Sequence, residues 1–233
     1  MVQVAVQACT RRSRRHERNE DRATVGVDVL SATAGVEHWS LRAPALITAL
    51  DGVGGAPHGE LASDLAARAL SSAEPPHDEA SATALLERAD RILLDAGEVD
   101  LTRKGMATTV AALVVPADGE PAVVVNVGDT LVAHLGPAGL EELTTSDRLN
   151  GGIFQSLGGR DDPGMRPHAR SLHLAVGDRL LLATDGLTDV VPVGTLEQIL
   201  RDEPEAASRL LELVEEADTP DDVTIVVVDL EEE

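Results

Sequence analysis

The order in which strand-like and helix-like patterns follow one another constrains the fold most strongly. Short apolar or alternating runs, typical of strands, occupy the first 50 residues and return between residues 106 and 185. The connections between neighbouring runs are short, which suits hairpins and favours antiparallel sheets over a doubly wound parallel sheet. The expected strands cover residues 2–8, 22–29, 43–50, 106–116, 121–128, 130–136, 169–176, 178–185 and 221–230.

Helices are expected in three blocks. Residues 58–73 and 81–97 each place Leu, Ile and Ala on one face of a helix. A third helical region covers residues 194–217 and is interrupted at Pro204, because proline cannot continue a helix. Helices gathered in this way indicate layers that cover the sheets, and we expect one α+β domain over residues 1–233.

The composition argues against several classes of function. The formal net charge of −22 disfavours a protein that binds nucleic acid or an anionic membrane. No apolar run approaches the about 20 residues that a membrane span needs. The N-terminal basic cluster follows its short apolar stretch, so a signal peptide is not expected. Cys9 is the only cysteine, which fits a reducing compartment. We therefore expect a cytoplasmic protein.

Acidic residues stand at the ends of several expected strands. Asp51 and Asp185 each follow a buried-looking strand and precede a glycine, in the stretches ALITALDG and LLLATDG. Further acids next to expected strands are Glu20, Asp21, Asp129 and Asp221. Carboxylates at the strand ends of a sandwich can converge on one rim, where they would repel one another unless a cation lay between them.

This arrangement favours a site for a hard divalent cation such as Mg²⁺ or Mn²⁺, which prefers oxygen ligands. An Asp-Gly turn leaves room for an ion, and a backbone carbonyl can bind it where no Cβ blocks the approach. A single Asp-Gly pair is a common turn and would mean little. Two such turns together with the other acids favour metal binding. The seven His residues are scattered, so a zinc site is not expected.

Eight stretches, in this order, resemble the motif series of the metal-dependent protein Ser/Thr phosphatases, the type 2C or PPM family. They are RNEDRATVG, ALDGVGGAPHGELAS, GMATTVAALVV, VVNVGDTLVAHL, ELTTSDR, FQSLGG, VGDRLLLATDGLTDVV and PDDVTIVVVDL. The resemblance runs from about Asn19 to Leu230. It implies a four-layer α-β-β-α sandwich, in which two antiparallel sheets lie between helical layers and the metal site lies at one end.

The resemblance also implies roles for the residues of the two Asp-Gly turns. Asp51 matches the carboxylate that bridges two metal ions, and Gly52 matches the residue whose carbonyl binds one of them. Asp185 and Asp221 match direct ligands of the first ion. The last motif usually reads Asp-Asn, whereas Asp222 stands here in place of the Asn, and we assign the ligand to Asp221.

Three further acids match outer positions of the same site. Glu20 and Asp21 match acids that hold metal-bound water, and Asp129 matches the residue that helps to bind a third, weaker ion. The expected cofactors are thus two Mn²⁺ or Mg²⁺ ions, with Asp129 at the place of a third.

The chain departs from the family pattern in three places. Family members often carry a phosphate-binding arginine where this chain has His16, and a register slip would let Arg15 or Arg18 serve. We favour Arg15 as the catalytic phosphate ligand, and the alternative is a solvated basic loop. Val53 stands where some members have a His that is proposed as a general acid. Residues 149–153 replace a usually longer flap, which predicts a more open site.

The expected activity is hydrolysis of phosphoserine and phosphothreonine on proteins, by a water activated between the two ions at Asp51, Asp185 and Asp221. A bacterial enzyme is expected, with a phosphoprotein substrate, a cognate Ser/Thr kinase as a candidate partner, and a monomeric state. One alternative is a weak or inactive domain that only binds a phosphoprotein. Another is a phosphatase dedicated to one bacterial regulator, such as an anti-sigma-factor antagonist.

Overall fold

Two six-stranded sheets form the centre of the protein in a computed structural model that describes residues 2–117, 120–159 and 164–232. The first sheet contains β1 (Val2–Arg11), β4 (Glu37–Arg42), β9 (Leu131–Gly136), β10 (Gly139–Glu142), β15 (Arg179–Ala183) and β16 (Val223–Glu232). The second contains β2 (Arg22–Val25), β3 (Asp28–Leu30), β5 (Ala45–Leu50), β7 (Val110–Val115), β8 (Ala122–Val127) and β14 (His168–Leu172). The strand orders are β10-β9-β15-β16-β1-β4 and β14-β8-β7-β5-β2-β3, and the neighbours are antiparallel.

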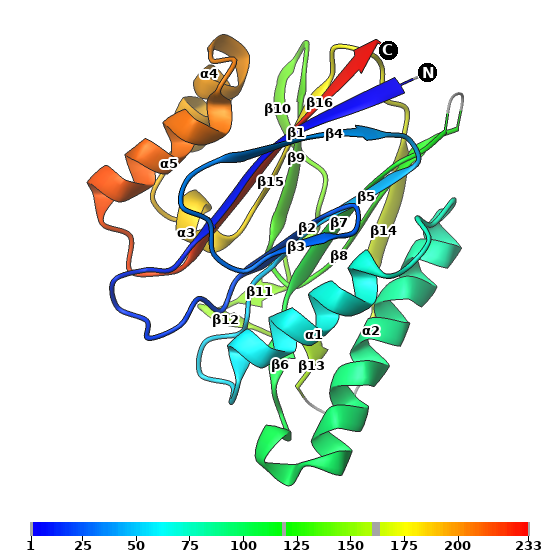
Figure 1. Ribbon diagram of the computed structural model, residues 1–233, viewed down its shortest axis with the longest axis vertical. Coiled ribbons are helices and arrows are strands. Elements are labelled where there is room, and N and C mark those ends of the chain that lie inside the picture. Colours follow the sequence, from blue (N-terminus) through cyan, green and yellow to red (C-terminus); the bar gives the residue numbers. More distant parts are fainter. Residues whose placement is uncertain (1, 118–119, 160–163, 233) are drawn as a thin grey trace.

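Helices cover the outer face of each sheet (Figure 1). The second sheet is covered by α1 (Gly59–Ser71) and α2 (Glu79–Val99), which the short 3-10 helix η1 (Leu101–Arg103) follows. The first sheet is covered by α3 (Asp185–Thr188), α4 (Val193–Asp202) and α5 (Ala206–Ala217). The layers are therefore α-β-β-α, as expected. None of the described helices has the length and apolar character needed to cross a bilayer.

Three apolar layers hold the sandwich together. The central layer lies between the sheets and contains Val4, Val6, Ile47 and Leu113, all buried. Two outer layers lie between each sheet and its helices. The core is built almost entirely from Val, Leu, Ile and Ala, since β-branched and aliphatic side chains pack well on the pleated surface of a sheet.

The main differences from the expected strands occur where the pattern carries little apolar signal. The expected strand 22–29 is two strands, β2 and β3, because the chain turns at Gly26, whose φ of 60° is in the left-handed region. The strand β4 was not expected, since four of its six residues are exposed and its apolar side chains are few. Edge strands of this kind lack the periodic apolar face that marks strands buried within a sheet.

Two small ribbons complete the end of the sandwich opposite to the chain termini. One pairs β6 (Ala107–Thr108) with β13 (Leu157–Gly158), and the other pairs β11 (Arg148–Leu149) with β12 (Gly152–Ile153). The hairpin β11–β12 occupies the place of the flap and is short, as expected.

The register of the sheets brings strand ends with acidic neighbours to this same end. In each of three strand pairs, a residue at or near the start of one strand lies opposite the last residue of its neighbour. These pairs are Arg22 with Leu50, Val110 with Val127 and Ile225 with Ala183. The acids that precede or follow these strands are therefore gathered at one rim, although they are far apart in the sequence.

Candidate metal centre

The turn that carries Asp51 follows β5 and is held in place by two buried threonines, Thr108 and Thr109, from another part of the chain. The Asp51 carbonyl oxygen accepts a hydrogen bond from the Thr109 N–H at 2.8 Å and from the Thr108 hydroxyl at 2.8 Å. The Asp51 N–H donates to the Thr109 hydroxyl at 3.2 Å. Both backbone groups of Asp51 are thus used, and its carboxylate has no part in holding the turn.

Gly52 allows two backbone segments to approach beside Asp51. Its N–H donates to the Glu20 carbonyl oxygen at 3.1 Å. A Cβ at Gly52 would lie 2.6 Å from the carbonyl carbon and oxygen of Gly59 and 2.9 Å from the Glu20 carbonyl oxygen. Because backbone atoms cannot move aside easily, a side chain here would separate Glu20 and the start of α1 from the Asp51 turn.

The second Asp-Gly turn lies on the other sheet and is equally close to a neighbouring backbone. Asp185 begins the short helix α3 directly after β15, and a Cβ at Gly186 would overlap the Asp222 carbonyl oxygen. Since Asp221 precedes Asp222, this close approach brings the two predicted metal ligands of the first sheet together.

A buried hydroxyl connects the acids of the two sheets. The Thr184 hydroxyl donates to Asp21 Oδ2 at 2.8 Å and accepts from the Thr224 N–H at 2.9 Å. Asp21 is only 1% exposed and precedes β2, whereas Thr184 and Thr224 belong to the first sheet side. Asp21 is therefore held in place by a group beside Asp185.

The electrostatics show that these carboxylates lie close to one another. Burial, and then the charges of neighbouring acids, raise the pKa values of Asp51 and Asp21 well above the usual range. The same causes raise the pKa of Asp185 to about 6. Burial also raises the pKa values of Glu20 and Asp129. A group of buried acids that disfavour their own ionised forms is an arrangement that a cation would stabilise.

The donor set fits a hard cation. Asp129 Oδ2 and Asp185 Oδ1 are buried and lack a hydrogen-bond partner, which leaves their lone pairs unsatisfied. Among the residues that the structure describes, no three His, Cys, Asp or Glu side chains converge tightly enough to enclose one ion. The carboxylates instead stand around a rim, and oxygen ligands with unused lone pairs are the kind that Mg²⁺ and Mn²⁺ bind.

Arg148 is a residue of the site that the sequence did not reveal. Its guanidinium lies 3.5 Å from Asp185 Oδ2 and 3.7 Å from Asp129 Oδ2, and it also contacts Asp189 at 3.3 Å. The stretch ELTTSDR contains Arg148, but nothing in its local sequence indicates that it reaches acids from two other segments.

Asp222, which replaces the usual Asn of the last motif, holds the basic loop of residues 11–18. Its carboxylate accepts from the backbone N–H groups of Ser13 at 2.6 Å and Glu20 at 2.7 Å. His16 Nδ1 lies 3.2 Å from its Oδ2. Burial would lower the pKa of His16, but the adjacent Asp222 carboxylate and the other nearby acidic charges outweigh burial and raise it. Asp222 thus has a structural role, and Asp221 stays the predicted ligand.

Arg15, the predicted phosphate ligand, is exposed on this loop. Within the described residues, its guanidinium makes no hydrogen bond or ion pair. The neighbouring arginines are engaged: Arg12 binds the His16 carbonyl, Arg14 lies 3.5 Å from Asp218, and Arg18 binds Glu60 at 2.9 Å. Arg15 is therefore better suited than these neighbours to bind a ligand, and its role remains a prediction.

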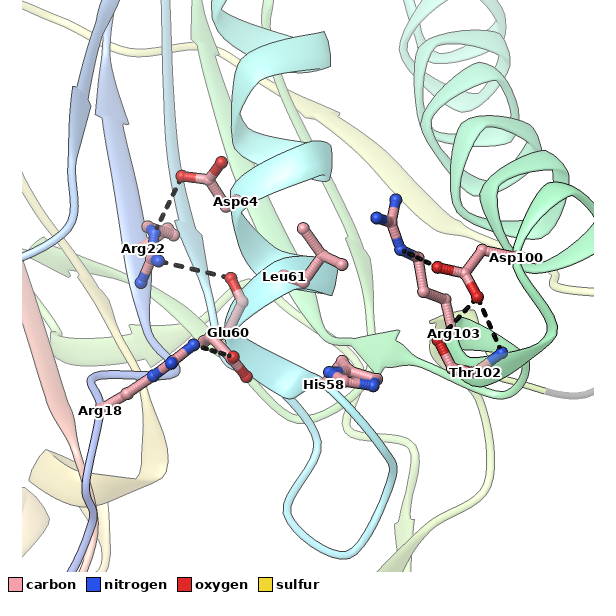
Figure 2. Close-up of a pocket in the computed structure, with 9 residues that line it drawn as sticks. All are labelled: Arg18, Arg22, His58, Glu60, Leu61, Asp64, Asp100, Thr102 and Arg103. Atoms are coloured by element: carbon pink, nitrogen blue, oxygen red, sulfur yellow. Dashed lines mark hydrogen bonds and ion pairs between the residues drawn. The ribbon is translucent and has the colours of Figure 1, made fainter.

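A cavity of about 540 Å³ lies beside the start of α1 (Figure 2). Figure 2 shows that its arginines are paired with carboxylates. The pairs are Arg18 with Glu60 at 2.9 Å, Arg22 with Asp64 at 3.4 Å and Arg103 with Asp100 at 3.0 Å. Since the charges balance, this cavity does not offer the excess positive charge that a second phosphate site would need. The exposed His58, which precedes α1, also lines it.

The fold and the acidic rim define the class of protein: a four-layer sandwich with a carboxylate-rich centre at one end. The family model described as protein phosphatase 2C matches residues 14–224, and the chain belongs to this family. The resemblance inferred from the sequence motifs is thus confirmed.

The comparisons with individual proteins agree with this assignment. The chain is 29% identical over an alignment of 211 residues to the serine/threonine protein phosphatase PstP of Mycobacterium tuberculosis. The match covers 79% of this chain and 40% of that protein. The chain therefore spans less than half the length of these curated relatives.

Solved structures of PstP share the fold. The crystal structure of the Mycobacterium tuberculosis protein has a TM-score of 0.77 and 26% identity, over 99% of this chain and 100% of that chain. A PstP catalytic domain in complex with two manganese ions has a TM-score of 0.76 and 27% identity, over the full length of both chains. The expected α+β sandwich is confirmed.

Proposed function

We propose that this protein hydrolyses the phosphate esters of phosphoserine and phosphothreonine in proteins, with divalent cations bound at the acidic rim. The observation that carries this proposal is the group of buried carboxylates from both sheets, with raised pKa values and unpartnered oxygens, in a chain of the protein phosphatase 2C family. Its relatives are named serine/threonine protein phosphatases, and one binds two manganese ions.

The residues of the two turns are the proposed ligands. Asp51 would bridge two ions, with the Gly52 carbonyl on one of them, and Asp185 and Asp221 would bind the first ion. When bound, Mn²⁺ or Mg²⁺ lowers the pKa of water and stabilises the charge that develops on a phosphoryl group. The protein positions the ligands. Hydrogen bonds to Thr109 fix the Asp51 backbone, so the Asp51 carboxylate is not needed to hold the turn and is available to bind ions.

The three outer acids are proposed to act around the two main ions rather than to bind them directly. Glu20 and Asp21 are proposed to accept hydrogen bonds from water on the ions, and Asp129 to bind a third, weaker ion. Asp21 is suited to this role, because the Thr184 hydroxyl binds only Oδ2 and holds the carboxylate in one orientation.

Phosphate binding is proposed for Arg15. A guanidinium can donate two parallel hydrogen bonds to a phosphoryl group, and Arg15 has no intramolecular partner among the described residues. Asp222 keeps the loop that carries Arg15 next to Asp221, through its bonds to Ser13 and Glu20. Because the hairpin at residues 149–153 is short, the rim is proposed to be more open to a protein substrate.

The remaining features of the proposal concern the whole molecule. We propose that residues 1–233 form one phosphatase domain that is monomeric and cytoplasmic, and that a cognate Ser/Thr kinase is its partner. Cys9, the only cysteine, is buried and free, which fits a reducing compartment. A domain that only binds phosphoproteins is disfavoured, because such a module has no need for buried acids that repel one another.

Phosphate release from matched peptides that contain phosphoserine, phosphothreonine or phosphotyrosine tests the proposal. With Mn²⁺ we expect hydrolysis of the first two, loss of activity in excess chelator, and recovery on adding Mn²⁺ or Mg²⁺. Thermal unfolding of the same samples should show a higher Tm with the ion, since the ion binds the folded state. Full activity in excess chelator would refute the metal-dependent mechanism.

A further inference from the structure

The guanidinium of Arg148 contacts three carboxylates from two segments, Asp129 after β8 and the pair Asp185 and Asp189 at the two ends of α3. Nη2 lies 3.5 Å from Asp185 Oδ2, Nε lies 3.7 Å from Asp129 Oδ2, and Nη1 lies 3.3 Å from Asp189 Oδ1. Only the Asp189 contacts meet hydrogen-bond geometry. The positive charge of Arg148 therefore lies among the three acids, while Asp129 Oδ2 and Asp185 Oδ1 accept no hydrogen bond from the described residues.

A buried carboxylate next to Arg148 fixes its place relative to Asp129. Asp147 is fully buried and accepts from the Gly128 N–H at 2.9 Å, from Gln155 Nε2 at 2.8 Å and from His168 Nε2 at 2.9 Å. Its own N–H donates to the Gly128 carbonyl oxygen at 3.0 Å. Because Gly128 precedes Asp129 and Asp147 precedes Arg148, the backbone of the acid and the backbone of its cation are held side by side.

We propose that Arg148 is an internal cation of the acidic rim, which competes with a metal ion for Asp129, Asp185 and Asp189. This inference rests on the proposed function, since it concerns the weakest of the expected metal positions. Arginine stays charged throughout the range in which carboxylates ionise, so it neutralises part of the rim whether or not ions are present. An ion that binds Asp129 must displace the guanidinium from that carboxylate.

The surroundings of Arg148 permit such an exchange. A cavity of about 450 Å³ is lined by Asp129, Asp185 and Arg148 together with apolar residues such as Leu131 and Leu196. The Arg148 side chain is 39% exposed, whereas that of Asp129 is only 6% exposed. The guanidinium can therefore move into the cavity, and a hydrated ion can enter from it, without a change in the backbone.

The test compares metal binding by the parent with that by Arg148→Met, which keeps much of the apolar stem and removes the charge. Isothermal titration with Mn²⁺ should show that the variant binds its weakest ion at least about tenfold more tightly, because a competing charge is gone. Arg148→Lys should lie between the two. Arg91→Met is the matched control, since Arg91 pairs with Asp95 and Glu98 on the exposed face of α2, and it should leave every ion affinity unchanged.

A second readout needs no metal. In excess chelator, Arg148→Met should lower the Tm more than Arg91→Met does, because it leaves three neighbouring acids without a counter-charge. Adding Mn²⁺ should then raise the Tm of Arg148→Met more than that of the parent. If the Met variant does not fold, Arg148→Gln gives the same comparison with hydrogen-bond donors retained.

The outcomes separate this inference from the proposed function. Unchanged or weaker binding of the weakest ion in Arg148→Met would overturn the competition, even if the enzyme is active. If neither protein binds Mn²⁺, the proposed function fails. In that case, the Tm values of Arg148→Met and Arg91→Met in chelator still test whether Arg148 neutralises the rim. A Tm loss in Arg148→Met no larger than that in Arg91→Met would overturn this role as well.

Discussion

The two Asp-Gly turns look alike in sequence but differ in what surrounds their carboxylates. Both follow a buried strand, and both need glycine because a neighbouring backbone lies against the turn. Arg148 lies 3.5 Å from Asp185, whereas Asp51 has no cationic side chain at ion-pair distance in the described part of the chain. One half of the rim thus has a cationic side chain beside its Asp-Gly turn, and the other half has none among the described residues.

The largest expected effect distinguishes a catalytic Asp51 from a structural one. Asp51→Asn keeps the shape and removes the charge, and we expect kcat/KM for a phosphoserine peptide to fall at least about a hundredfold, or about 2.7 kcal/mol. Asp185→Asn should show a loss of the same order. In chelator, both variants should be at least as stable as the parent, because each removes one member of a repelling group.

Asp95→Asn is the control for these two variants, since Asp95 is an exposed acid on α2 that pairs with Arg91. It should keep parental activity. A well-folded Asp51→Asn protein that hydrolyses the peptide at a near-parental rate would mean that the bridging position is wrongly assigned. Lower stability with unchanged activity per folded molecule would mean that Asp51 only forms a turn.

The next largest effect is a loss of stability when the glycines of the two turns are replaced. A Cβ at Gly186 overlaps a backbone carbonyl, so Gly186→Ala should lower the free energy of unfolding by about 2 kcal/mol, as overpacking does. Gly52→Ala should cost somewhat less, since the nearest backbone atoms are 2.6 Å away. Denaturant unfolding in chelator measures both. Gly194→Ala on α4 is the control, because nothing lies within 4 Å of its Cβ, and it should be neutral or stabilising. Equal stability of Gly186→Ala and Gly194→Ala would contradict the close approach.

The next prediction concerns substrate binding by Arg15, whose loop is held by Asp222 next to the Asp185 turn. Arg15→Ala should raise KM for a phosphopeptide about tenfold, or about 1.4 kcal/mol, with little change in Tm, because the side chain has no intramolecular partner among the described residues. Arg14→Ala removes a neighbouring exposed arginine that lies 3.5 Å from Asp218 and should leave KM near the parental value. Equal effects of the two substitutions would support a solvated basic loop instead.

The smallest effect concerns pH. The pKa of Asp185 is raised to about 6 and that of Asp51 is raised well above 3.8, so the folded state binds these protons more tightly than the unfolded state. The unfolding free energy of the metal-free protein should therefore fall as pH rises from about 4 through 6, and it should be larger at pH 5 than at pH 8 by about 1 kcal/mol.

Urea unfolding at several pH values measures this trend. Asp51→Asn should flatten it more than Asp185→Asn does, because Asp185 has the cationic Arg148 at 3.5 Å, whereas Asp51 has no cationic side chain at ion-pair distance in the described part of the chain. Saturating Mn²⁺ should remove the trend or reverse it. A metal-free protein that becomes more stable as pH rises through this range would show that the carboxylates of the rim do not repel one another.

The parts of the site that the sequence predicted are those with a local signature. An aspartate followed by glycine after an apolar run is visible within a few residues, and the position of Asp51 and Asp185 at strand ends followed directly. The apolar periodicity of β5, β7 and α2 likewise marked the elements that pack around the core. The confirmed family resemblance supplied the rest of the expected ligand set.

The parts that the sequence did not predict depend on contacts between distant segments. Arg148 reaches Asp129 and Asp185, which lie 19 and 37 positions away, and no periodic pattern links them. The contacts of Asp222 were likewise not predicted, since its carboxylate binds the backbone N–H groups of Ser13 and Glu20. An asparagine offers only one side-chain oxygen for such bonds, which gives the departure from the usual motif a structural reason.

The bonds from Asp222 to Ser13 and Glu20 also have an entropic consequence. One carboxylate closes a loop of eight residues, and closing a free chain of that length costs on the order of 2 kcal/mol. The protein meets this cost when it folds, rather than when a substrate arrives. A phosphorylated chain that meets Arg15 then has only one side chain to immobilise, so more of the energy of the new contact appears as affinity.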